Sequence, residues 1–204
     1  MQLLIKHGAD VTAQDETHTT PLHLASSLGI PEIVQLLIEC GADVTSQDWT
    51  HQTPLHMASS WVSPKAAFLS IQHRGHRTDI NGQDESINKS CNPFSWKTET
   101  VKLLIDHGAD VTAQDETKST PLHIASSVGI TKTVQLLIEH GADVTARDVR
   151  SMTPLHLASS VGSTEAVRLL IEHGADVTAR DVHSMTPLHM ASSWVSGEST
   201  HLVM

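Results

Sequence analysis

The sequence predicts an all-α fold, a solenoid in which one short helical unit recurs along the chain. Two motifs carry this prediction because they repeat in phase. Thr-Pro-Leu-His begins at Thr20, Thr53, Thr120, Thr153 and Thr186, and Gly-Ala-Asp-Val-Thr begins at Gly8, Gly41, Gly108, Gly141 and Gly174. In both series the intervals are 33, 67, 33 and 33 residues. Such a period is typical of stacked supersecondary units, which present a long surface instead of an enclosed pocket.

Each period is predicted to begin with a short first helix. In the repeat over residues 148–181, the Thr153 hydroxyl is suited to cap a helix, and Pro154 is suited to its first position. Apolar residues follow at Leu155, Leu157 and Ala158. Gly162 then interrupts the helical pattern.

A second helix and a loop complete the unit. The second helix is predicted from Thr164, with apolar residues at Val167, Leu169, Leu170 and Ile171. Gly174 is placed to end it, because glycine adopts a positive φ without steric strain. Residues 175–185 are polar with mostly short side chains, which predicts a protruding loop before the next repeat.

These motifs resemble the ankyrin repeat family, whose pattern joins Thr-Pro-Leu-His, a glycine between helices, a Leu-Leu pair and Gly-Ala-Asp. The resemblance covers nearly the whole chain except about residues 62–97. It implies antiparallel helix pairs stacked in parallel, with β-hairpin or loop fingers at right angles, and protein binding through finger tips and first helices. It also implies that the motif histidines are structural and bond near each helix start; these are His23, His56, His123, His156 and His189.

The chain departs from the family pattern in two places. The family commonly has asparagine after Gly-Ala-Asp-Val, but all five copies here have threonine, so asparagine hydroxylation is not expected at that site. The family also favours glycine two residues before Thr-Pro. This chain has His18, His51, Lys118, Ser151 and Ser184 there. Because a left-handed residue is less comfortable without glycine, a different turn is expected.

One segment breaks the period. The predicted organisation is repeats over residues 1–61, an irregular segment over 62–97, and further repeats over 98–204, the last of them incomplete. The interval to the next Gly-Ala-Asp is 55 residues after Thr53 but 21 after Thr20, so 34 residues are extra. Because neighbour contacts stabilise such arrays, we expect this segment to weaken the coupling between the two halves.

Two explanations for the irregular segment remain open. A decayed repeat is indicated because residues 76–86 match residues 107–117 at five of eleven places. Residues 92–94 would then be a worn Thr-Pro-Leu that leads into a shortened first helix. A translated intron is indicated because His-Met-Ala-Ser-Ser-Trp-Val-Ser occurs at 56–63 and again at 189–196, and the pattern collapses after both copies. Trp-Val-Ser can be encoded by codons that contain a typical intron donor.

Composition restricts the class of partner and the cellular compartment that are expected. The formal net charge of −10 disfavours nucleic acid and anionic membranes as partners. No apolar run is long enough to span a membrane, and the start lacks the pattern of a signal peptide. Cys40 and Cys91 lie at unrelated repeat positions, which favours a reducing compartment. We therefore expect the cytoplasm, with the nucleus as the alternative.

The sequence does not indicate an enzyme, a metal or a cofactor. Nine of the 15 histidines fall at repeat spacing, where a structural role explains them. The irregular cluster of His73, His76 and Cys91 falls short of a four-ligand zinc site. Gly-rich phosphate loops and nucleophile–base motifs are also missing from the sequence.

The predicted function is a scaffold or adaptor that binds a protein partner through its finger loops. Tryptophan and arginine dominate many protein interfaces, and Trp49, Met152 and Met185 are expected to stand in solvent. The candidate residues are Trp49, His51, Arg147, Arg150, Met152, Arg180, His183 and Met185. The arginines suit an acidic patch on the partner. A near-identity of repeats is equally explained by duplication without a selected ligand.

Alternative functions are a regulatory or substrate-adaptor fragment of a larger protein, or a truncated product without independent function. Neither end resembles a polar cap, so the chain is interpreted as a fragment of a longer array. It is expected to be a monomer unless exposed end repeats self-associate.

Overall fold

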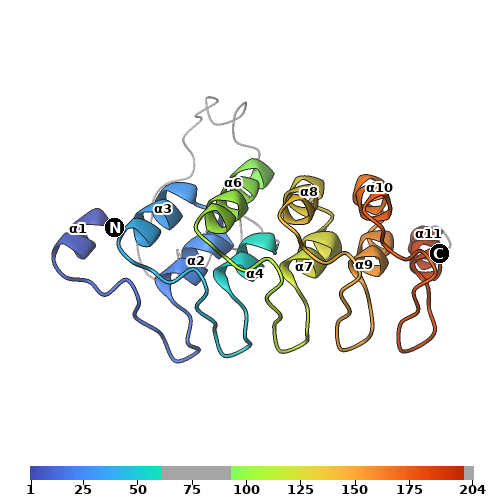
Figure 1. Ribbon diagram of the computed structural model, residues 1–204, viewed down its shortest axis with the longest axis horizontal. Coiled ribbons are helices and arrows are strands. Elements are labelled where there is room, and N and C mark those ends of the chain that lie inside the picture. The colour runs from blue at the N-terminus through green and yellow to red at the C-terminus, as the bar shows by residue number, and fades with distance from the viewer. Residues whose placement is uncertain (61–92, 200–204) are drawn as a thin grey trace.

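The structure is a computed structural model, and it describes residues 1–60 and 93–199. Its helices are α1 (Gln2–Lys6), α2 (Pro21–Leu28), α3 (Pro31–Glu39), α4 (Pro54–Ser59), α6 (Pro93–Asp106), α7 (Pro121–Val128), α8 (Thr131–Glu139), α9 (Pro154–Ser160), α10 (Thr164–Glu172) and α11 (Pro187–Ser199). First and second helices form two adjoining rows, and the loops project to one side (Figure 1). The described residues contain helices and no strand, so the prediction of an all-α solenoid is confirmed.

The core is a ladder of leucines that runs through both rows of helices. Each complete pair buries one leucine from its first helix and one from its second. These are Leu22, Leu55, Leu122 and Leu155 on the first helices, and Leu37, Leu104, Leu137 and Leu170 on the second. At the two ends of the described stack, the equivalent leucines Leu4 and Leu188 are exposed, because no helix covers them.

The stack is continuous across the irregular segment. A Cβ on Gly29 would lie 2.7 Å from Lys97 Cγ in α6, just as one on Gly129 would lie 3.3 Å from Ser163 Cβ before α10. Lys97 therefore occupies the place of Ser163, and α6 is the second helix of the unit that α4 begins. This unit packs on both neighbouring units, while weak coupling between the halves stays a prediction.

This arrangement also bears on the two explanations for the extra residues. Pro93 opens α6, a second helix, so the expectation that residues 92–94 lead into a worn first helix is wrong for the described part. The match over residues 76–86 and the cluster of His73, His76 and Cys91 lie outside the described residues. Within the described residues, α4 and α6 pack together as one helix pair.

The motif histidines link each first helix to the next finger. His123 is buried, and its Nδ1 accepts a hydrogen bond from the Thr120 backbone N–H at 3.2 Å. Because a backbone N–H only donates, the ring proton must sit on Nε2, which donates to the Met152 carbonyl at 3.1 Å. His23, His56 and His156 make the equivalent pair of bonds.

The residues that replace the family glycine keep a left-handed conformation. His18, His51, Lys118, Ser151 and Ser184 have φ between 58° and 60°. The expected change of turn is therefore not seen at these residues. Instead, side chains with a Cβ adopt a conformation that glycine adopts without steric strain.

Replacing Ser151 with glycine is expected to stabilise the fold. The Ser151 φ of 58° places its Cβ close to the following carbonyl oxygen. Relief of this strain is expected to raise the free energy of unfolding by about 1 kcal/mol, measured by urea denaturation. Ser151→Ala is the control because it retains the Cβ. An equal gain in both variants would argue against backbone strain as the cause.

Candidate partner-binding surface on the finger loops

Each finger is held in shape by an aspartate at its start. In one finger, the Asp148 Oδ1 accepts hydrogen bonds from the Arg150 and Met152 backbone N–H groups, both at 2.8 Å. The Asp148 N–H also donates to the Met152 carbonyl at 3.0 Å, which closes the loop. In the first finger, the hydroxyl of Thr17 and the N–H groups of Thr19 and Thr17 lower the pKa of Asp15. These bonds fix the tip without a β-ladder.

Backbone hydrogen bonds join successive fingers into one row. The Trp49 N–H donates to the Thr17 carbonyl at 3.1 Å, and the Val149 N–H donates to the Thr117 carbonyl at 2.9 Å. The Glu116 N–H donates to Thr50 and the Val182 N–H to Arg150 in the same way, at 2.9 and 3.0 Å. The link from Glu116 to Thr50 joins the fingers on either side of residues 61–92. The finger row, defined as residues 14–19, 47–52, 114–119, 147–152 and 180–185, is thus a continuous surface.

Trp49 stands at a finger tip and is 70% exposed. This confirms the expectation that its side chain lies in solvent. Nearby, His51 is also exposed, and its Nδ1 lies 3.2 Å from Gln47 Oε1 of the same finger. The indole is the largest apolar group on the N-terminal part of the row.

The three candidate arginines lie on two adjacent fingers. Arg147 donates to the Ser151 carbonyl at 3.2 Å and to the Arg180 carbonyl at 2.8 Å, so it ties its finger to the next. Arg180 donates to the Ser184 carbonyl at 3.3 Å. The Arg150 side chain is 66% exposed, with Nε 3.9 Å from Asp148 Oδ2. Arg150 is therefore the arginine with the weakest internal bonding in this group.

Met152 is buried, and the expectation that its side chain stands in solvent is wrong. It is 8% exposed, while Met185, at the equivalent position of the next finger, is half-buried. The residue before Thr-Pro lies at the finger base, where its carbonyl accepts from the histidine of the preceding repeat. His183, by contrast, is exposed, and its N–H donates to Asp181 Oδ1 at 2.8 Å.

Two exposed tip residues were missed by the sequence-based set. Val149 and Val182 are 55% and 56% exposed, and they occupy the same tip position as Trp49. The repeat alignment contained the signal, because all three directly follow the finger aspartate. The tips therefore change from Glu16, Trp49 and Glu116 to two valines along the row.

The described residues contain neither a membrane-spanning helix nor a cluster of metal ligands. Within these ranges, no helix is long and apolar enough to cross a membrane. In the same part of the chain, no three His, Cys, Asp or Glu side chains are grouped so that they could hold a metal ion.

Two family models match this chain, and both describe ankyrin repeats. A model of ankyrin repeats in three copies matches residues 1–84 and 95–148, and a model of ankyrin repeats in many copies matches residues 137–191. Over 35 residues the chain is 54% identical to protein phosphatase 1 regulatory subunit 27 from Mus musculus. This match covers 17% of this chain and 23% of that relative. The chain thus spans less than a quarter of the curated relative that it matches. From the matches, the repeated motifs and the stacked helix pairs, we conclude that the chain belongs to the ankyrin repeat family.

Proposed function

We propose that this chain is a non-enzymatic interaction module that binds a protein partner along the finger row, in the cytoplasm. One observation carries the proposal: Trp49 is 70% exposed on a loop whose backbone is held by several hydrogen bonds. A large aromatic group on a preorganised frame loses little conformational freedom on binding, which makes it a strong interface anchor. The proposed contact residues are Trp49, His51, Arg147, Arg150, Arg180, His183 and Met185, with Met152 supporting the finger base.

The charge pattern of the row restricts the partner. Trp49 is flanked along the row by the tips that carry Glu16 and Glu116, whereas Val149 and Val182 lie among the three arginines. A complementary partner has basic groups opposite the N-terminal fingers, and acidic and apolar groups opposite the C-terminal fingers.

Replacing Trp49 with alanine is expected to weaken partner binding by about 1–3 kcal/mol, because an aromatic anchor is lost. The partner is first captured from a native lysate, with a Trp49→Ala/Arg150→Ala/Met185→Ala variant alongside to identify proteins retained through the fingers. Its affinity for the wild type and for Trp49→Ala is then measured by calorimetry, with circular dichroism to verify folding.

Ile171→Ala is the control, because Ile171 is 44% exposed on α10, outside both the finger row and the groove between α3 and α6. It removes an exposed apolar side chain without touching the fingers. Equal affinity of wild type and Trp49→Ala would exclude Trp49 from the interface.

The likeness to a phosphatase regulatory subunit supports membership of the ankyrin repeat family and does not indicate a particular partner. It covers 35 residues, close to the 33-residue period, so it corresponds to about one repeat. A regulatory or adaptor role within a larger protein is the alternative. It uses the same surface, and the Trp49 experiment tests both.

A further inference from the structure

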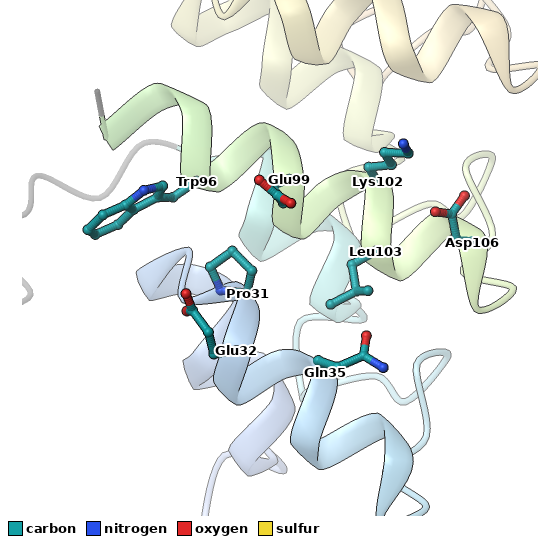
Figure 2. A pocket seen from close by; sticks show the side chains of 8 residues that line it. All are labelled: Pro31, Glu32, Gln35, Trp96, Glu99, Lys102, Leu103 and Asp106. Atoms are coloured by element: carbon teal, nitrogen blue, oxygen red, sulfur yellow. The ribbon is translucent and has the colours of Figure 1, made fainter. Parts of the chain in front are cut away.

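A groove lies between the second helices α3 and α6 (Figure 2). These two helices are on the side of the stack away from the fingers (Figure 1). It encloses about 470 Å³. Pro31 and Glu32 of α3 form one wall, and Trp96 and Glu99 of α6 form the other (Figure 2). Asp106 lies at the far end of the groove on α6.

The wall that contains Trp96 arises from an extra turn of helix. In repeat alignment, Pro31, the first residue of α3, corresponds to Thr98, but α6 already begins at Pro93. Trp96 consequently stands where the equivalent position of other repeats has Gly29 or Gly129. Its indole is 46% exposed and extends the wall beyond the start of α3.

In the described part of the chain, the carboxylates of the groove form no ion pair, although Lys102 also lines the groove. No ion pair there includes Glu32, Glu99 or Asp106. On α10, by contrast, the Arg168 guanidinium pairs with both Glu165 and Glu172. Lys102 replaces that arginine on α6, and its ammonium group is turned away from α3 (Figure 2).

We propose that this groove binds an arginine side chain from a basic segment of a protein partner. The guanidinium stacks on the face of Trp96 and donates hydrogen bonds to the carboxylates of Glu32 and Glu99. Arginine suits this site better than lysine, because its planar fork both stacks on aromatic rings and pairs with carboxylates. The net charge of −10 further favours a basic segment. This surface is separate from the finger row and does not depend on the function proposed for it.

The experiment titrates acetyl-Arg-Gly-Arg-Gly-Arg-amide into the full chain by calorimetry. Trp96→Ala is expected to weaken binding by about tenfold, and so is Glu32→Gln/Glu99→Gln. Trp96→Phe is expected to keep most of the affinity, which excludes a folding defect at this position. The peptide with lysine in place of arginine is expected to bind more weakly to the wild type.

Glu165 and Glu172 on α10 supply a control, because they are carboxylates of another second helix and lie outside both the groove and the finger row. Glu165→Gln/Glu172→Gln removes two negative charges and is expected to change the affinity less than about twofold. A greater loss in this variant would overturn the proposal. Equal loss in both sets, or unchanged binding by Trp96→Ala, would also overturn it, by showing attraction to overall charge or to another site.

Discussion

Acidification from about pH 7.5 to about pH 5.5 is expected to lower the free energy of unfolding by up to about 4 kcal/mol. The cause lies in three motif histidines. Burial lowers the pKa of His23, His56 and His123 below the ordinary value of 6.5, although bonded carbonyls and nearby aspartates such as Asp48 partly oppose this shift. Their folded form is neutral, because Nδ1 accepts a backbone N–H and so cannot also hold a proton.

The sign follows from the proton count in each state. Below pH 6.5 the histidines of the unfolded chain are protonated, whereas the buried ones stay neutral down to their lower folded pKa. Stability is therefore complete above pH 6.5 and falls as the pH decreases towards the folded pKa. Each histidine contributes a slope of about 1.4 kcal/mol per pH unit at most, and three contribute about 4.

Urea denaturation at several pH values, followed by circular dichroism, measures this dependence. His18→Gln/His51→Gln is the control, because both of these histidines are exposed. The control variant is expected to retain the wild-type pH profile. A stability that stays constant between pH 7.5 and 5.5 would show that the buried histidines are not the acid-sensitive groups.

Replacing Lys97 with isoleucine is expected to raise the free energy of unfolding by about 2 kcal/mol at neutral pH. Lys97 is 5% exposed, and burial lowers its pKa from 10.5 to about 8. Such a shift corresponds to roughly 3 kcal/mol of destabilisation when the lysine is charged. The Lys97 Nζ donates to the Ser60 carbonyl, and loss of this bond offsets part of the gain. Ile30 and Ile130 occupy the equivalent position in other repeats, so the substituted side chain fits this site.

The pH dependence separates this explanation from improved packing alone. The unfolded lysine has a pKa of 10.5 and the folded one a pKa of about 8, so wild-type stability rises as the pH increases from 8 through 10.5. The advantage of Lys97→Ile is therefore expected to shrink over this range in urea denaturation. Lys132→Ile is the control, because Lys132 is exposed on α8. An advantage that does not change with pH would contradict a charge penalty at Lys97.

The sequence by itself determined the architecture of the repeat, because its signals are local. Thr153 and Pro154 specify a helix start through capping and a fixed φ, and α9 begins at Pro154 as expected. Gly174 ends the second helix with a φ of 92°. The exposure of Trp49 followed from its place in the loop, since a tip on a solenoid has few neighbours.

Contacts between repeats determine which loop and helix residues are buried. The sequence of one repeat contains little information about these contacts. Met152 shares its loop with exposed residues, yet it is buried at the finger base, where its carbonyl accepts a hydrogen bond from His123 of the preceding repeat. Burial of Lys97 and the groove beside Trp96 depend on α6 packing against the preceding unit, although 32 residues, 61–92, separate the described parts of the chain. Only the tertiary structure could place α6 there, because the energy of stacking belongs to the interface between units and not to either unit alone.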